Sequence, residues 1–499
     1  MKILRILSLL LVLLMLTSAF AACGGDPVET TGEGKKPIAN DRDEIADTVP
    51  LDLNYNGETV TFLVRGNSSD SHKYELACEK LLNDPLYDAI HYRNIDVEAR
   101  LGLKIRTVEQ PGTWEDQTEW CNTLSTSVLT NTGDFDGAAF YLSAGAGLAK
   151  DGIYYNLFTL TKDEAGYLDL EKPWWNQSMT EELGVFGALF FAGSSLAITQ
   201  AQNTACVFFN RDLFNQKYPD DRDTALYQLV RDGKWTIDKM TDYVSNCWDD
   251  LNSNGVADNG DVVGIRNLGN ASGVMDAWIY AMGLDITKNN AYGEPELVLV
   301  NGQTVPAYEK VRALFNNEGG LLIASQADLG ETDMPNGNVM FMPNVVNYGK
   351  EMKESTVNYG VLPIPKYDEE QDNYRTCFGN IASALAICSN LSESRAAMVS
   401  AVLELLSAES YKQVLPVYYG TVLKGHYSRE QADAEMYDRI LETAVFSFGF
   451  AYSTSSLGSI SGIFRKLQLD YDIQNTIDSN KDVWEQKLTD LLLALEEVS

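Results

Sequence analysis

The most specific chemical pattern in the sequence is a run of oxygen-bearing side chains within residues 250–261. Such side chains stand at positions 1, 3, 5, 9 and 12 of the run, and Gly255 stands at position 6. This is the spacing of an EF-hand calcium loop, in which the glycine allows a sharp turn and position 7 offers its carbonyl. The spacing predicts a structural calcium site formed by Asp250, Asn252, Asn254, Val256, Asp258 and Asp261.

The last position of this run departs from the calcium-loop pattern. Asp261 stands where an EF-hand carries glutamate, and its shorter side chain has less reach for bidentate coordination. Extracellular modules work with weak calcium affinity, of about 10⁻⁴–10⁻³ M. The alternative is a metal-free Asn-Gly turn. Apolar residues at helical spacing from Thr236 to Trp248 predict a helix that leads into the loop.

Catalytic motifs are missing from the sequence. Its three histidines, His72, His91 and His426, are far apart, and no nucleophile-elbow, zinc-protease, phosphate-loop or dinucleotide pattern occurs. A glycosidase carboxylate pair has no sequence spacing, because the separation of its two groups is spatial. Nothing singles out such a pair, so we expect a binding protein rather than an enzyme.

Charge and length narrow the class of protein further. The 499 residues include 71 acidic and 38 basic ones, for a net charge of −33, and 45% are hydrophobic. Such a charge opposes binding to nucleic acid, which depends on Lys and Arg contacts with phosphates. It also disfavours highly anionic ligands unless a local basic pocket overrides it. The length predicts two to four domains or lobes.

The first 51 residues predict export and a lipid anchor. Lys2 and Arg5 precede an apolar run that is too short to span a bilayer, and small residues lead from that run to Cys23. We expect residues 1–22 to be a signal peptide that resembles those of bacterial lipoproteins. Cys23 would carry the acyl chains, palmitate among them, and residues 23–51 would be a flexible tether. The protein would then lie on the extracellular face of the cell membrane, in contact with lipid through its anchor only. The alternative is an ordinary cleaved signal peptide.

The remaining cysteines show no metal or redox motif. None of them forms a C-x-x-C pair, and a chain of this size needs no disulfide. We therefore expect mostly free, buried thiols at Cys78, Cys121, Cys206, Cys247, Cys377 and Cys388.

Alternating strands and helices predict a parallel sheet near the N-terminus. The pattern favours strands at 58–64, 103–108 and 135–141, and helices at 86–101 and 114–129, with Gly102 ending the first helix. In such sheets ligands bind beyond the carboxyl ends of the strands. The residues that follow the first and third strands are therefore candidate ligand-binding residues: Arg65, Asn67, Tyr141 and Ser143.

Five segments in a consistent order resemble one protein family. They are Tyr92–Ile105, Val207–Phe214, Lys234–Asp238, Asn358–Lys366 and Ala401–Lys412. Together they resemble the extracellular solute-binding proteins (family 1, maltose-binding type) of bacterial carbohydrate ABC importers. The resemblance covers roughly residues 52–499. Trp235, which lies in one of these segments, is expected to pack against the start of a helix.

The resemblance implies an α/β fold of the two-lobed, type II periplasmic-binding-protein architecture. In that fold crossover hinge strands join the lobes, and a ligand cleft lies between them. By position, lobe one would be 52–210 plus 375–412 and lobe two 211–374 plus 413–499, with Asn210 and Arg375 near the crossovers. The implied function is capture of a sugar or oligosaccharide by lobe closure and its delivery to the permease subunits of an ABC importer. We expect a monomer. A helix is predicted at the C-terminus, around Trp484–Leu495.

The resemblance also implies further ligand-binding residues. Asn344 and Asn347 stand where the maltose-binding type carries a sugar-stacking tryptophan, and Trp278 and Tyr452 lie in other sugar-contacting stretches. Trp175 would line the cleft or pack the hinge. Three alternatives stay open: an exported glycan-active enzyme, a structural surface lipoprotein, and a binder of another organic solute.

Overall fold

The computed structural model describes residues 42–67, 69–267, 272–322 and 333–499. The chain divides into two compact units, Met1–Glu44 and Ile45–Ser499, and the sheets and helices of the described fold belong to the second unit. The predicted signal peptide, the lipidated Cys23 and most of the predicted tether lie outside the described residues. None of the helices in the described ranges combines the length and the apolar character that crossing a bilayer requires.

A four-stranded sheet contains the strands predicted near the N-terminus. Its order is β11–β3–β1–β2, formed by β1 (Thr59–Arg65), β2 (Lys104–Gln110), β3 (Gly137–Tyr141) and β11 (Ser383–Ile387). β1 pairs in parallel with both β2 and β3, whereas β11 runs antiparallel to β3. The connecting helices are α3 (Pro85–Leu101) and α4 (Gln117–Leu129). The predicted parallel sheet and its helices are confirmed.

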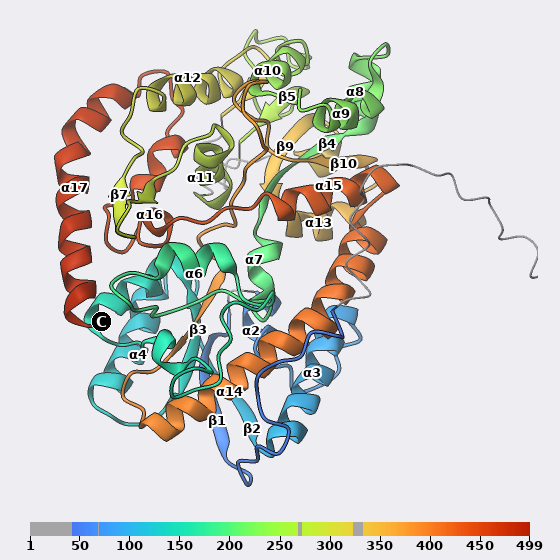
Figure 1. Cartoon of the computed structure of the whole chain (residues 1–499). Helices are drawn as coiled ribbons and strands as arrows, with labels where there is room; N and C mark the ends of the chain where they lie inside the picture. Colours follow the sequence, from blue (N-terminus) through green and yellow to red (C-terminus); the bar gives the residue numbers. More distant parts are fainter. Residues whose placement is uncertain (1–41, 68, 268–271, 323–332) are drawn as a thin grey trace, which may run out of the picture. The chain divides into compact units, whose positions relative to one another are not determined.

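Local signals in the sequence explain the ends of α3. The Asp84 carboxylate accepts a hydrogen bond of 2.9 Å from the Leu86 backbone N–H, and Pro85 occupies the first turn, where its missing N–H costs nothing. Gly102 ends the helix in the left-handed conformation, with φ of 59°. One face of α3 is buried, and α14 (Glu393–Glu409) packs beside it (Figure 1).

A five-stranded sheet forms the second half of the architecture. Its order is β10–β4–β9–β5–β8, formed by β4 (Ala205–Asn210), β5 (Val263–Arg266), β8 (Gly320–Leu321), β9 (Val339–Val345) and β10 (Tyr359–Leu362). β5 is parallel to β8 and β9, and β4 is antiparallel to β9 and β10. A separate hairpin pairs β6 (Thr287–Asn289) with β7 (Pro295–Leu297).

Helices and helical turns complete the described fold. The shorter helices between β1 and β4 are α2 (Asp70–Tyr74), α5 (Leu142–Gly145), α6 (Gln177–Leu183) and α7 (Ile198–Gln202). Later helices include α8 (Arg211–Lys217), α9 (Arg222–Arg231), α10 (Ile237–Ser245), α11 (Ser272–Ala281), α12 (Thr304–Phe315), α13 (Gly349–Glu354), α15 (Gln431–Glu442), α16 (Phe448–Ala451) and α17 (Ile473–Glu497). Wide helical turns, η7 (Ser410–Val414) and η8 (Val417–Tyr427), extend α14, and η9 (Ile460–Arg465) is a tight one.

The predicted C-terminal helix is confirmed as α17. Trp484, Leu488, Leu491 and Leu495 are buried along it, as their helical spacing requires. Trp235 is also fully buried, and its indole N–H donates to the Pro363 carbonyl at 2.9 Å. The six cysteines from Cys78 to Cys388 are free thiols, and all but Cys121 are buried.

Three chain segments lie side by side where the chain passes between the two sheets. The Ala205 N–H donates to the Cys377 carbonyl at 3.0 Å, and the Gly379 N–H donates to the Asn203 carbonyl at 2.8 Å. On the other side, the Val445 N–H donates to the Thr376 carbonyl at 2.8 Å. These segments have the arrangement expected of a hinge, while the lobe bounds remain a prediction.

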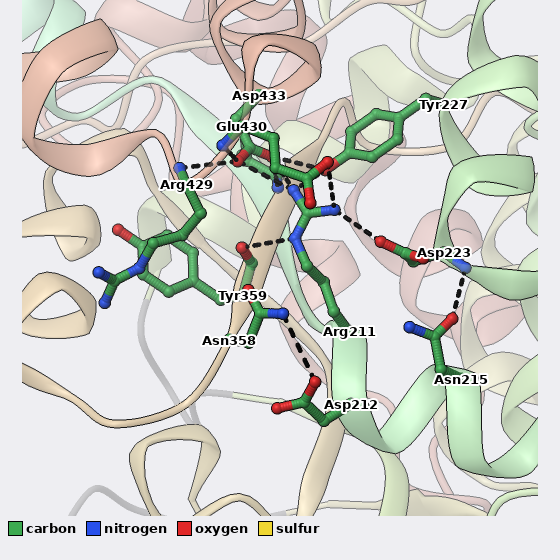
Figure 2. Close-up of polar contacts among 11 residues, drawn as sticks. Arg211, Asp212, Asn215, Asp223, Tyr227, Asn358, Tyr359, Arg429, Glu430 and Asp433 are labelled. Atoms are coloured by element: carbon green, nitrogen blue, oxygen red, sulfur yellow. Dashed lines mark hydrogen bonds and ion pairs between the residues drawn. The ribbon is translucent and has the colours of Figure 1, made fainter.

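A buried charge network ties four elements of the second half together (Figure 2). The Arg211 guanidinium at the start of α8 contacts Asp223 at 2.7 Å and Asp433 at 2.9 Å, and it donates to the Tyr359 carbonyl at 3.0 Å. The Tyr227 hydroxyl of α9 donates to Asp433 at 2.5 Å. Arg211 and Asp433 are each 1% exposed, so this ion pair is fully removed from water.

Candidate ligand-binding site

Two of the predicted ligand-binding residues meet at the carboxyl end of the first sheet. Arg65 is the last residue of β1 and Tyr141 is the last residue of β3. The Arg65 guanidinium carbon lies 5.1 Å from the centre of the Tyr141 ring, within the range of a cation–π contact. Burial raises the pKa of Tyr141 to about 12, whereas the charges of Arg65 and Arg465 oppose that rise.

An exposed tryptophan extends this pair towards solvent. The Trp114 ring lies 6.2 Å from the Tyr141 ring at an interplanar angle of 59°, and 51% of Trp114 is exposed. An exposed aromatic ring beside polar groups suits a sugar, whose C–H face packs on the ring while its hydroxyls are hydrogen-bonded. Trp114 was not among the ligand-binding residues predicted from the sequence. Its place after the carboxyl end of β2 was the signal that could have found it.

Asn67 positions the loop that carries Trp114. Its side-chain oxygen accepts a hydrogen bond of 2.8 Å from the Gly112 N–H, and its amide donates to Asp116 at 3.1 Å. Ser143 in α5 is buried, and its N–H donates to the Asn380 carbonyl at 3.2 Å. The Ser143 hydroxyl has no hydrogen-bond partner among the described residues. All four residues chosen from the strand ends therefore lie at or beside the same edge of the sheet.

A buried charged pair lies in the second half of the chain. Asp276 of α11 is fully buried, and its two oxygens accept hydrogen bonds of 2.6 Å from Arg465 of η9. The Ser461 hydroxyl donates to the same carboxylate at 3.1 Å. The charge of Arg465 lowers the pKa of Tyr141 and that of Asp276 raises it. Sequence reasoning missed this pair, because its members stand 189 residues apart and belong to no motif.

Three predicted aromatic residues are packed into the core. Trp278 is fully buried, with its ring centre 5.8 Å from that of Phe315. Tyr452 is 2% exposed and lies 4.6 Å from the Phe448 ring. Trp175 is 3% exposed, and its indole N–H donates to Glu404 at 2.9 Å. A role in ligand binding stays a prediction for all three.

The two asparagines chosen by resemblance lie on the second sheet. Asn344 belongs to β9, where it is paired with Cys206 of β4, and its side-chain oxygen accepts a hydrogen bond of 2.8 Å from the Val345 N–H. Asn347 lies in the following turn, η6 (Val346–Tyr348), and is partly exposed. Contact of either residue with a ligand remains a prediction.

The first half of the predicted calcium loop turns as an EF-hand loop does. The Asp250 carboxylate accepts hydrogen bonds from the Asn254 N–H at 3.2 Å and the Gly255 N–H at 2.8 Å. Gly255 has φ of 78°, the left-handed conformation that favours glycine. The Asn252 amide donates to Asp258 at 2.9 Å. The helix predicted before the loop is α10, and it is confirmed.

The last predicted calcium ligand is engaged elsewhere. Asp261 is fully buried and accepts hydrogen bonds from the Leu251 N–H at 2.9 Å and the Trp248 indole at 3.2 Å. Within the described ranges, no three His, Cys, Asp or Glu side chains are grouped closely enough to hold a metal ion. The first half of the loop therefore fits calcium and Asp261, as it lies, does not. The calcium site remains a prediction.

Calcium is expected to stabilise the folded protein if this loop binds it. At about 5 mM calcium and a Kd of about 10⁻⁴–10⁻³ M, the free energy of unfolding would rise by about 1–2 kcal/mol. Thermal unfolding with calcium and with a chelator measures this rise. Asp250→Ala should abolish it, whereas Asp368→Ala, in another acidic loop, should not. Identical unfolding curves with calcium and with chelator would refute the site.

Several solved structures share the fold of this chain. No family model matches the sequence, and no curated protein matches it. A cyclo/maltodextrin-binding protein solved with maltotetraose aligns with a TM-score of 0.55 at 12% identity, over 89% of this chain and 98% of that one. UgpB from Mycobacterium tuberculosis, solved with glycerophosphocholine, aligns with a TM-score of 0.56 at 14% identity, over 87% of this chain and 99% of that one.

A third similar structure is an ABC substrate-binding protein from Listeria monocytogenes in complex with cycloalternan. It aligns with a TM-score of 0.52 at 12% identity, over 87% of this chain and 99% of that one. The two-sheet α/β architecture is thus that of the periplasmic solute-binding proteins, and the similarity extends over nearly the whole chain. The predicted fold class is confirmed.

Proposed function

We propose that this protein is an extracellular solute-binding protein that captures a carbohydrate and delivers it to an ABC importer. The observation that carries the proposal is the group formed by Trp114, Tyr141 and Arg65 at the carboxyl ends of parallel strands. An exposed ring offers a stacking surface, and the polar groups around it suit hydroxyls. Similar structures hold maltotetraose and cycloalternan, which supports a saccharide ligand.

The proposed mechanism is closure of two lobes around the ligand. Residues Arg65, Asn67, Tyr141 and Ser143 would contact it from the lobe of the first sheet, and residues near Asp276 from the lobe of the second. A ligand that contacts both lobes favours the closed arrangement by the difference in its affinity for the two states. The three hinge segments would bend, and the closed form would present its surface to the permease.

The cellular setting completes the proposal. A lipid anchor at Cys23 and the tether after it would hold the protein on the outer face of the membrane, within reach of the permease.

Ligand binding measured in the presence of a chelator tests whether calcium contributes to solute capture. A glycan-active enzyme would convert an oligosaccharide, whereas a binding protein releases it unchanged. Product analysis after incubation therefore separates the two, and a structural lipoprotein would bind no solute.

Trp114→Ala is expected to weaken binding of the saccharide that stabilises the wild type. Loss of one stacking ring costs about 1–2 kcal/mol, or roughly 5- to 30-fold in Kd. Because half of Trp114 is exposed, the melting temperature should change little. Thermal shift over an oligosaccharide panel finds the ligand, and titration calorimetry gives the Kd.

Tyr292→Ala is the matched control for this substitution. Tyr292 is an aromatic residue that is 89% exposed, in the turn between β6 and β7. Its removal should leave the Kd unchanged. Equal affinities of Trp114→Ala and the wild type would contradict the stacking role, and failure of every saccharide to bind would refute the carbohydrate function.

A further inference from the structure

Arg65 is a buried cation with unused hydrogen-bond donors. It is 1% exposed, and its Nη2 donates to the Ile381 carbonyl at 2.9 Å and to the Ser383 hydroxyl at 2.8 Å. Its Nε and Nη1 have no hydrogen-bond partner among the described residues. A buried donor without a partner is costly. This guanidinium is therefore prepared for a group that the chain itself does not supply.

Two buried guanidinium groups contact Glu75, Arg93 directly and Arg65 through the Ser383 hydroxyl. Arg93 is a second fully buried guanidinium, and its nitrogens donate to uncharged oxygens, those of Glu75 (backbone), Leu76, Asn94 and Ser410. The Glu75 carboxylate is the nearby anion, and it accepts hydrogen bonds from the hydroxyls of Thr199 and Ser383. Two buried cations thus share one buried carboxylate.

Arg65 is charged at neutral pH, because burial lowers its pKa only to about 10. Burial raises the pKa of Glu75, whereas hydrogen bonds from Ser383 and Thr199 and the charge of Arg65 oppose that rise. Burial and the charge of Arg65 lower the pKa of His72 well below its usual range, so His72 adds no positive charge.

A small pocket lies against the Arg65 side chain. It is lined by Arg65, Gly112, Gln117, Trp120, Cys121, Tyr141 and Ala144, and as it stands it is too small to hold a water molecule. A Cβ atom at Gly112 would overlap the Arg65 side chain. Only glycine therefore lets the loop that contains Gly112 lie this close to the arginine. The exposed Trp114 belongs to the same loop, which must move for a ligand to reach the guanidinium.

We propose that Arg65 receives an anionic substituent of the ligand, so that the solute is an acidic saccharide. This inference rests on the proposed function, and it names the substrate class of the same site. A carboxylate of a uronic acid and a sulfate or phosphate ester of a sugar share the required chemistry, an oxygen anion on a sugar ring. Charge-assisted hydrogen bonds to arginine are the stronger kind. The guanidinium of Arg65 would oppose, within this site, the repulsion expected from the net charge of −33.

Matched pairs of saccharides test this inference. Oligogalacturonates and oligoglucuronates are titrated against the full mature chain beside their methyl esters, which keep the stereochemistry and lose the charge. Sulfated and phosphorylated oligosaccharides form a separate arm, and maltotriose is the neutral reference. The acidic member of a pair should bind about tenfold or more tightly than its neutral partner. The arm that contains the tightest ligand identifies the anionic group.

Variants of Arg65 test whether this side chain causes the tighter binding of acidic saccharides. Arg65→Gln should lose the preference for the acidic member, and Arg65→Lys, which keeps the charge, should retain part of it. Arg106→Gln, an exposed arginine on the neighbouring strand β2, makes the same change of charge and should have no effect. If circular dichroism shows that Arg65→Gln does not fold, the matched pairs on the wild type decide.

The outcomes separate this inference from the proposed function. Equal binding of acid and ester, or tighter binding of the neutral member, overturns the acidic ligand and leaves the carbohydrate function standing. An acid preference that survives in folded Arg65→Gln overturns the role of Arg65. Failure of all saccharides to bind contradicts both proposals.

Discussion

Asp433→Asn is expected to lower the free energy of unfolding by about 3–5 kcal/mol, because it removes the fully buried one of the carboxylates that balance Arg211. The Asp433 carboxylate accepts hydrogen bonds from Arg211 at 2.9 and 3.0 Å, from Tyr227 at 2.5 Å and from the backbone N–H groups of Arg429 and Glu430 at 3.0 and 3.1 Å. An asparagine offers one acceptor oxygen and turns an amide N–H₂ towards some of these donors. Denaturant unfolding monitored by circular dichroism measures the loss.

Glu435→Gln, two residues further along the same helix, provides the matched control. Glu435 forms an ion pair with Arg231 at 2.6 Å, but the two side chains are 42% and 39% exposed. Solvent screening makes such a pair worth at most about 1 kcal/mol. The two variants make the same chemical change at a buried and at an exposed pair. Equal destabilisation by both would show that burial of the Arg211 network does not matter.

The stability of the protein is expected to fall as the pH rises from about 4.5 to about 7, through the titration of Glu404. Glu404 in α14 is fully buried, and burial raises its pKa to about 7, although hydrogen bonds from the Asp169 N–H, Trp175 and Trp174 oppose the rise. A folded-state pKa above the unfolded value of 4.5 means that the folded protein binds the proton more tightly. The stabilisation is complete below pH 4.5 and is lost through pH 7. It amounts to about 3 kcal/mol at 1.36 kcal/mol per pKa unit.

Glu404→Gln isolates this contribution from that of other titrating groups. The difference in the free energy of unfolding between wild type and variant should change by up to about 3 kcal/mol between pH 5 and pH 8, in favour of the wild type at the lower pH. Glu393→Gln, in the exposed first turn of the same helix, controls for the loss of one carboxylate. A Glu404→Gln curve that stays parallel to the wild-type curve would contradict the prediction. Fluorescence of Trp174 and Trp175, whose indoles donate to Glu404 at 3.1 and 2.9 Å, should report the same transition near pH 7.

The elements of the first sheet were predictable because their signals are local. β1 is rich in β-branched residues, Asp84 and Gly102 mark the ends of α3, and the spacing of Trp484, Leu488 and Leu491 specifies the buried face of α17. Each of these signals acts within a few residues of the structure that it determines. The turn at Gly255 is local in the same way, and it too forms as predicted.

The candidate site was only partly predictable. Arg65, Asn67, Tyr141 and Ser143 were found because the topology of a parallel sheet specifies which edge binds ligands. Trp278, Trp175 and Tyr452 were chosen by resemblance, and a role in ligand binding stays a prediction for all three. All three are buried in contact with other core residues, and an aromatic side chain fills a core as readily as it lines a pocket.

The sequence by itself determined the secondary structure of the first sheet and the alternation of its strands and helices, and it predicts the edge where a ligand would bind. The tertiary structure alone decided which side chains meet there. Arg65 contacts Ser383 across 318 residues and Arg465 pairs with Asp276 across 189, and no pattern in the sequence relates such partners. The tertiary structure also decided that Arg65 is buried and that two of its hydrogen-bond donors have no partner among the described residues. Burial and hydrogen bonding depend on the packing of distant segments, which the sequence pattern does not reveal. Local rules specify elements, whereas the chemistry of the site arises where those elements come together.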